Sequence, residues 1–212
     1  MFWKKSDDKW KAIEKNINEA ENSISINYSE FKSLSAIDEL KINPQSTLGS
    51  FLQHIDSFVV NGYLRMTTGN INRAGNIATV TGKIREQYGY EKIMVVANDI
   101  WGGFFAINNG ELSNNIEEIW YFSPDTLEWE NTEKNYTEFL EWVCSGDVEY
   151  YYSEWMWDNM ENEIKDFSNS DGIFTYPFLW ADEYELTTAK RNKAPWFEIT
   201  GINAYYLNQM NN

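Results

Sequence analysis

Apolar positions follow a helical period near the N-terminus and again at residues 46–55. The apolar residues of the first segment share one face of a helix: Trp10, Ile13, Ile17 and Ala20. Polar residues 6–8 precede this face and suit the start of the helix. Residues 46–55 carry the same spacing and predict a second helix.

Between the two ends of the chain, continuous apolar runs and turn signals predict strands. Asn61-Gly62 separates the apolar runs 58–60 and 63–66, which is a strong signal of a β-hairpin. Further strands are predicted over four ranges: 92–97, 104–107, 119–122 and, as a short edge strand, 127–130. The glycine- and asparagine-rich stretch 69–82 predicts a loop with room for a short helix.

After residue 135 the period becomes helical again. Asn135 and Glu138 have the spacing of a capping box, and Gly146 suits the end of that helix. Asp147 is expected to cap a long second helix over 147–166. The buried face predicted for that helix consists of Val148, Tyr151, Tyr152 and Trp155. Then follow a loop over 169–172, an extended segment over 176–180 and a last helix from Pro195 to Met210.

The concentration of strands in the middle predicts a single α+β domain with a central, mainly antiparallel sheet flanked by helices. The length of 212 residues suits one domain with its own core. Three parts are expected within it: a helical segment over 1–45, a sheet-rich core over 46–132, and a helical, acidic part over 133–212.

Charge is distributed unevenly. Residues 1–100 hold 12 basic and 12 acidic residues, whereas residues 101–212 hold 5 basic and 21 acidic residues. A net charge of −16 argues against nucleic acid as a partner, because phosphates are bound by Lys and Arg. The acidic half predicts a surface for a basic protein partner, or, more simply, a well-solvated surface.

Several function classes have little support in the sequence. No apolar stretch is long enough to span a membrane and no signal peptide is evident, so we expect a cytoplasmic protein. Cys144 is the only cysteine and is expected to be a small core residue. His54 is the only histidine, which excludes zinc sites with two histidines. We therefore expect no metal and no cofactor.

Paired carboxylates remain as candidate chemistry. Four acids lie at predicted strand ends close to tryptophans: Asp99, Asp125, Glu128 and Glu130. Such a cleft could bind a sugar, with one carboxyl of raised pKa acting as an acid. Trp101, Trp157 and Trp180 flank turns or helix ends, where an aromatic side chain can line a cleft or fill a core.

Two motifs are distinctive. Residues 98–110 read Asn-Asp-Ile-Trp-Gly-Gly-Phe-Phe-Ala-Ile-Asn-Asn-Gly, and residues 119–130 read Ile-Trp-Tyr-Phe-Ser-Pro-Asp-Thr-Leu-Glu-Trp-Glu. Together with residues 46–49, 62–66, 136–142 and 176–180, they resemble an uncharacterised bacterial domain family. That family reads Asp-x-x-Gly-Gly-Phe-Phe-Ala-x-Asn-Gly-Gly and then Tyr-Phe-x-Pro-Asp-x-Leu-x-Trp. The resemblance covers about 46–180.

More distantly, the order of strands, glycine turn and C-terminal helix resembles the SUKH superfamily, named for yeast cell-wall regulators and bacterial toxin-immunity proteins. This resemblance implies an α+β fold and a protein that neutralises a toxin, often a nuclease, by binding it. It carries over no catalytic residue.

Two functions follow as hypotheses. The first is a non-enzymatic, acidic binding protein of the immunity type, whose partner is a basic protein. Its docking surface is expected on the predicted helix over 147–166, where an aromatic pair lies among acids: Tyr150, Glu154, Trp157, Asp158 and Glu161. The alternative is a small-molecule or glycan-binding protein, or a hydrolase, that uses the cleft of tryptophans and carboxylates. Asp99, Trp101 and Trp180 are further candidate binding residues.

Overall fold

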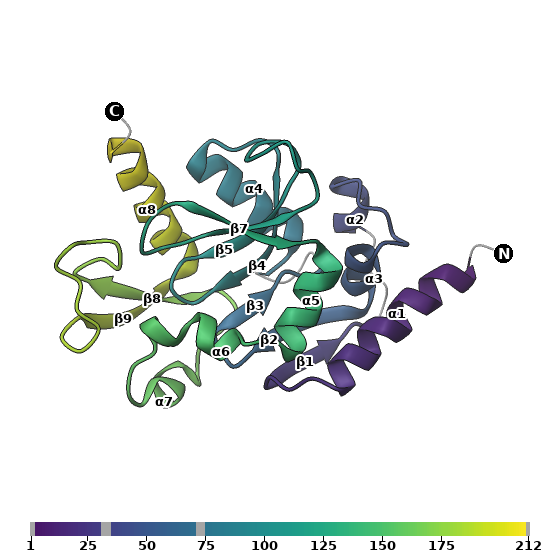
Figure 1. The fold of residues 1–212 in the computed structure, drawn as a ribbon, viewed down its shortest axis with the longest axis horizontal. Helices are drawn as coiled ribbons and strands as arrows, with labels where there is room; N and C mark the ends of the chain where they lie inside the picture. The colour runs from purple at the N-terminus through teal and green to yellow at the C-terminus, as the bar shows by residue number, and fades with distance from the viewer. Residues whose placement is uncertain (1–2, 31–34, 71–74, 211–212) are drawn as a thin grey trace.

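The computed structural model describes residues 3–30, 35–70 and 75–210. Its centre is a seven-stranded antiparallel sheet in which each strand pairs with its neighbours in the chain. The predicted α+β domain, with a mainly antiparallel sheet flanked by helices, is confirmed (Figure 1). In the described ranges, no helix is both long and apolar enough to cross a membrane.

The strands of the sheet are β1 (Ile24–Tyr28), β2 (Ile55–Val60), β3 (Leu64–Met66), β4 (Ile93–Asp99), β5 (Phe104–Asn108), β6 (Ile119–Phe122) and β7 (Trp129–Lys134). The helices are α1 (Trp3–Asn18), α2 (Ser35–Glu39), α3 (Thr47–His54), α4 (Ile77–Tyr88), α5 (Tyr136–Ser145), α6 (Val148–Tyr151), the 3-10 turn η1 (Ser153–Trp155), α7 (Met160–Ile164) and α8 (Trp196–Met210). A separate hairpin consists of β8 (Asp171–Tyr176) and β9 (Lys190–Pro195).

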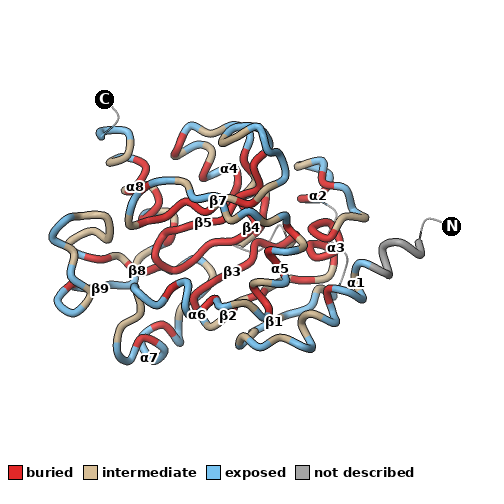
Figure 2. The backbone as a smooth tube through the Cα atoms, viewed as in Figure 1, coloured by how far each residue is buried: buried red, intermediate tan, exposed pale blue. Residues whose placement is uncertain are grey.

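Helices cover both faces of the sheet. On one face, α3 and α5 supply Phe51, Leu140 and Val143 to a core that also contains Phe105 from β5; α5 lies in front of the sheet in Figure 1. On the other face, α4 and α8 supply their apolar side chains to a second core around Phe104. The buried residues therefore concentrate in the central strands (Figure 2).

The hairpin turn predicted at Asn61-Gly62 is confirmed. Asn61 has φ 50° and Gly62 has φ 78°, so both residues lie in the left-handed region that a tight hairpin of this kind requires. The predicted strands over 92–97, 104–107 and 119–122 match β4, β5 and β6, and the predicted edge strand lies two residues further on, as β7.

The capping box that begins α5 is also confirmed. The Asn135 side chain accepts hydrogen bonds from the backbone N–H groups of Thr137 and Glu138, at 2.8 and 3.2 Å. The Glu138 side chain accepts one from the backbone N–H of Asn135 in return. These bonds satisfy N–H groups that have no partner within the helix.

Replacing Asn135 by alanine is expected to lower the free energy of unfolding by about 1 kcal/mol, because the capping acceptor is lost. Urea unfolding monitored by tryptophan fluorescence measures it. Asn135→Ser keeps an acceptor and is the control, expected within a few tenths of a kcal/mol of the parent. Equal stability of the alanine and serine variants would contradict the capping role.

The helix α4 is longer than the sequence predicts, because the stretch 69–82 indicates only a loop with a short helix. The stretch 69–82 is indeed irregular at its start, but α4 begins at Ile77 and continues to Tyr88. Asn76 caps it by accepting from Ala78 and Thr79 backbone N–H groups, and Gly89 ends it at φ 77°. Asn76 and Gly89 are recognisable helix-end residues in the sequence. Gly82, inside the helix, favours a loop prediction because glycine is unfavourable in a helix interior.

The prediction of one long helix over 147–166 is wrong. The segment forms α6, η1 and α7, with a break at Asn159, whose φ is 67°. Asp147 makes no side-chain capping bond. Of the predicted buried face, Val148 and Tyr152 are buried, whereas Tyr151 is 38% exposed. The helical spacing of this segment therefore does not correspond to one continuous helix.

The parts over 1–45 and 133–212, both expected to be helical, also contain strands: β1 in the first part and the β8–β9 hairpin in the second. β8 begins inside the predicted loop 169–172, and the predicted extended segment 176–180 contributes only its first residue to the strand. The last helix is as predicted, with α8 beginning directly after Pro195 and ending at Met210.

Candidate functional site

Asp99 is the one acid in the motif over 98–110, and it is fully buried. Its Oδ1 accepts hydrogen bonds from the backbone N–H groups of Trp101 and Gly103, at 2.8 and 3.0 Å. Its Oδ2 accepts from the hydroxyl groups of Tyr121 and Tyr152, at 2.7 and 3.3 Å. Burial raises the pKa of Asp99, the four hydrogen bonds act in the opposite direction, and burial is the larger effect, so the pKa is about 6. The carboxylate closes the β4–β5 turn, and the side chains around it leave no space for a substrate.

The same carboxylate also contacts the segment after residue 147, which forms α6, η1 and α7 in place of one helix. The Tyr152 hydroxyl group donates a hydrogen bond to Asp99, and the Tyr152 ring stacks on Trp101 with centroids 5.1 Å apart. Trp155 and Tyr63 pack against this pair. Trp101 is accordingly buried. The Asp-x-x-Gly-Gly motif therefore anchors the 150–155 segment to the sheet.

The other acids of the predicted cleft belong to a different turn from Asp99. Asp125, Glu128 and Glu130 belong to the β6–β7 turn and to β7. Partial burial raises the pKa of Glu130, and the neighbouring Asp125 and Glu128 raise it further. Neither of the two hollows described below is lined by any of these four carboxylates.

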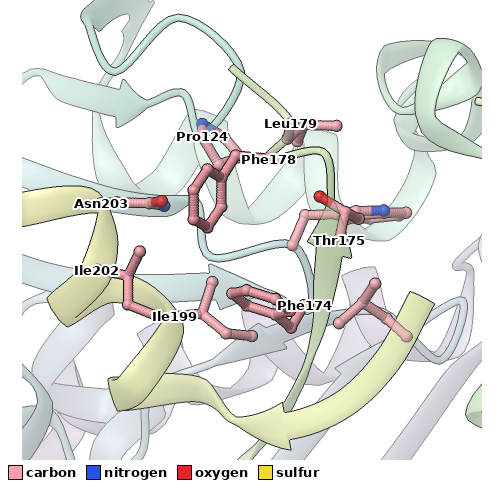
Figure 3. A pocket seen from close by; sticks show the side chains of 10 residues that line it. Pro124, Phe174, Thr175, Phe178, Leu179, Ile199, Ile202 and Asn203 are labelled. Atoms are coloured by element: carbon pink, nitrogen blue, oxygen red, sulfur yellow. The ribbon is translucent and has the colours of Figure 1, made fainter. Parts of the chain in front are cut away.

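A small apolar pocket lies between β8, α8 and the loop after β8 (Figure 3). Trp101 forms part of its lining, and Phe178, Ile199 and Asn203 face it. Its volume of about 20 Å³ holds about one water molecule. Trp180 does not line it; its ring stacks on Phe178 at 4.9 Å. This pocket is too small for a substrate.

The second hollow is much larger, and we call it the polar groove; its volume is about 1000 Å³. Its floor is the outer part of the sheet, with Ser25 from β1 and Ser57 and Val59 from β2. Its wall is the segment 156–169, which contributes Trp157 and Glu161 among others. This volume is at the upper end of what ligand-binding clefts span.

The register of the sheet explains why this floor is open. Directly opposite residues in successive strands share one face, and these are Ser25, Val59, Arg65, Asn98 and Phe104. α4 and α8 cover this face at Phe104. Arg65 is buried and donates a hydrogen bond to the carbonyl oxygen of Asp171, at the start of β8. Beyond Arg65, Val59 and Ser25 are left as the floor of the groove.

The rim of the groove is acidic. Glu21, Glu149 and Glu161 line it, and Lys165 is the basic residue in its lining. All four side chains are exposed. Because the groove is open to water, salt and solvent screen these charges.

Trp157 joins the groove wall to the β8–β9 hairpin. Its Nε1 donates a hydrogen bond to Glu163 at 3.0 Å. The guanidinium carbon of Arg191, in β9, lies 4.6 Å from its ring centroid. A cation–π contact of this kind shows that a guanidinium fits against this ring. One face of Trp157 therefore stabilises the fold, while the side chain still lines the groove.

The structure separates the residues predicted as a docking surface. Trp157 and Glu161 line the groove. Tyr150, which is 78% exposed, Glu154 and Asp158 are exposed outside its lining. Tyr150 and Trp157 do not share a helix face, because the helix between them is broken. The sequence prediction did not include Ser25, Ser57 or Lys165 as site residues. Ser25 lies in β1, a strand that the sequence did not predict.

Cys144 and His54, the one cysteine and the one histidine of the sequence, both pack against other parts of the protein. Cys144 is buried, as expected, and burial raises its pKa to about 11. His54 stacks on Trp10 at 4.2 Å, and its Nδ1 lies 2.8 Å from the Ser50 carbonyl oxygen. Within residues 3–30, 35–70 and 75–210, no three His, Cys, Asp or Glu side chains are grouped to hold a metal ion.

Residues 2–199 match a family described as "Protein of unknown function DUF2625". The chain belongs to this family. Within known bacterial proteins it is similar to the uncharacterised protein YbfG of Escherichia coli, with 30% identity over 156 residues, 73% of this chain and 72% of YbfG. It is also similar to an uncharacterised protein of Haemophilus influenzae, with 45% identity over 91 residues, 43% of this chain and 40% of that protein. No solved structure matches the chain. The expected membership of an uncharacterised bacterial family is thereby confirmed.

Proposed function

We propose that the protein is a non-enzymatic binding protein that receives a basic protein partner at the polar groove, in the manner of an immunity protein that neutralises a nuclease-like toxin. The observation that carries this proposal is the large open groove with Glu21, Glu149 and Glu161 in its lining. The net charge of −16 has the same sign as this rim. A positively charged partner would be attracted from a distance and oriented by the rim.

The burial of Asp99 and Cys144, two side chains capable of catalytic chemistry, also supports a non-enzymatic function. Asp99 makes four hydrogen bonds and is fully buried. The Cys144 thiol has a raised pKa, which disfavours the thiolate. The distant resemblance to the SUKH superfamily leads to the same proposal, because many of its members act by binding toxins. We also propose that the protein works in the cytoplasm, where a nuclease-like toxin would act.

The alternative, a sugar-binding or hydrolytic cleft of tryptophans and carboxylates, draws less support. Asp99 is enclosed by Tyr121 and Tyr152, and Trp180 stacks within its own loop. A hydrolase of this type needs two carboxyl groups facing one open cleft. Asp125, Glu128 and Glu130 line neither the small pocket nor the polar groove.

Replacing Glu21, Glu149 and Glu161 by glutamine is expected to lower the association rate with a basic partner by about tenfold at low salt, and the difference should shrink as salt screens the charges. The partners to be tested are any basic proteins encoded directly beside this gene in its host. Biolayer interferometry at several salt concentrations gives the rates.

A second triple variant controls for net charge. Glu117, Glu128 and Glu183 are exposed acids outside the groove, and their replacement by glutamine changes the charge equally. We expect this variant to keep most of the parent rate. Equal slowing of both variants would mean that overall charge, and not the groove, attracts the partner. Absence of any binding to the parent protein would contradict the proposed function.

A further inference from the structure

The two edges of the sheet are built differently. β1 and β7 are the end strands, and each pairs with one neighbour only. β7 contains Glu130, Glu133 and Lys134, and its ladder is interrupted where Glu133 has φ 57°. Charges and irregular backbone on an end strand prevent another strand from pairing with it. The β7 edge is therefore protected in the usual way.

The β1 edge lacks this protection. Its residues Ile24–Tyr28 read Ile-Ser-Ile-Asn-Tyr, with no charge and no proline. Ser25, Asn27 and Tyr28 are exposed, and the ladder to β2 is regular up to a shift between Asn27 and Tyr28. β-branched isoleucines alternating with short polar residues are well suited to pairing with a further strand.

The backbone groups on the open edge can be assigned. The Asn61 backbone N–H donates to the Ser23 carbonyl oxygen, so Ser23 and Asn61 are a hydrogen-bonded pair. Such pairs alternate along an antiparallel ladder, so Ser25 and Asn27 bond to β2 as well. The N–H and C=O groups of Ile24 and Ile26 then point to the open edge. Among the described residues, β1 pairs with β2 alone.

This open edge adjoins the polar groove. Ser25 belongs both to β1 and to the groove floor, and Glu21 on the rim lies three residues before β1. A strand added to β1 would extend the floor, and alternate side chains of that strand would face the same side as Ser25. Basic side chains in these positions would meet the acidic rim of Glu21, Glu149 and Glu161.

We infer that an extended, basic segment of the partner pairs with β1 as an additional strand and places its lysine or arginine side chains in the polar groove. This inference rests on the proposed function and specifies how the partner binds. Main-chain hydrogen bonds to Ile24 and Ile26 supply a sequence-independent part of the affinity, and the rim selects positive charge. A second copy of this chain fits less well, because both copies would bring acidic rims together.

The probe is a nine-residue peptide of alternating lysine and threonine, compared with the same peptide methylated on every backbone nitrogen. Both carry the same charge, but the methylated peptide has no N–H groups to donate to β1. We expect the unmodified peptide to bind at least tenfold more tightly, measured by titration calorimetry. Hydrogen exchange by NMR should show slower exchange at the Ile24 and Ile26 amides on binding, with no change along β7.

The outcomes separate the two proposals. Equal binding of the two peptides, with unchanged exchange at Ile24 and Ile26, would overturn strand addition and leave a basic partner at the groove possible. Loss of peptide binding in the Glu21, Glu149 and Glu161 glutamine variant supports the groove itself. Dimerisation of the protein alone, with β1 amides already protected, would overturn the assigned occupant. Failure of both peptides to bind would overturn the inference, while the proposed function would still be decided by the association rates of the neighbouring gene product.

Discussion

Replacing Asp99 by alanine is expected to lower the free energy of unfolding by about 4 kcal/mol, because two backbone N–H groups and two tyrosine hydroxyl groups lose their acceptor inside the protein. Urea unfolding at pH 7 measures the change. Asp182 is an exposed acid, and Asp182→Ala is the control, expected within about 0.5 kcal/mol of the parent. A loss below about 1 kcal/mol for Asp99→Ala would contradict the anchoring role.

The pH dependence of stability gives an independent test of the same residue. The Asp99 pKa is about 6 in the folded protein and 3.8 is its ordinary value, so the folded state binds this proton more tightly than the unfolded state. The free energy of unfolding should therefore rise as the pH falls through 6 and should level off below 3.8. Between pH 7 and pH 5 this group contributes about 1 kcal/mol.

Asp99→Asn isolates this contribution, since the amide does not titrate. Glu130 also has a raised pKa and contributes with the same sign in both proteins. The difference between the two pH profiles therefore belongs to Asp99. Parallel profiles for the parent and Asp99→Asn would mean that the Asp99 pKa is not raised by folding.

Replacing Gly103 by alanine is the second large effect expected, at about 3 kcal/mol of lost stability. A Cβ atom at this position would overlap the Tyr121 hydroxyl group and the Asp99 carboxylate, which are bonded to each other. Gly103 is thus required by its surroundings. The preceding Gly102, with φ 99°, is required by its backbone conformation.

Gly82→Ala is the matched control for Gly103→Ala. Gly82 lies exposed in α4, and an added Cβ would meet nothing within 4 Å. Alanine in a helix interior is favoured over glycine, so this variant should gain about 0.5–1 kcal/mol. Thermal unfolding of both variants measures the contrast. Comparable stability for the two alanine variants would show that the space around Gly103 can relax.

Elements with local signals could be predicted from the sequence, and elements that depend on distant contacts could not. The Asn61-Gly62 turn, the strand over 92–97 and the Asn135 capping box each act within a few residues. β9 reads Lys-Arg-Asn-Lys-Ala-Pro, without apolar alternation, and forms a strand only because it pairs with β8. The helical spacing over 147–166 does not reveal the break at Asn159, whose φ of 67° interrupts the helix.

The candidate site shows the same division. Trp157 and Glu161 could be selected because aromatic and acidic residues in an acidic segment suggest a surface for a partner. Ser25 and Ser57 carry no such signal, and they form the groove floor only because β1 and β2 pair at the edge of the sheet. A binding surface assembled from strands separated along the chain becomes visible only when their register is known.

The strand order of the sheet also bears on folding. Because each strand pairs with its neighbour in the chain, the ladders can form as a succession of short loop closures, which favours rapid assembly. The Asn22 side chain is different, since it donates hydrogen bonds to the carbonyl oxygens of Val143 and Gly146, more than 120 residues away. Closing so long a loop has a high entropic cost unless the intervening strands have already formed. We therefore expect the turn between α1 and β1 to dock against the end of α5 late, after the ladders of the sheet, β1–β2 among them, have formed.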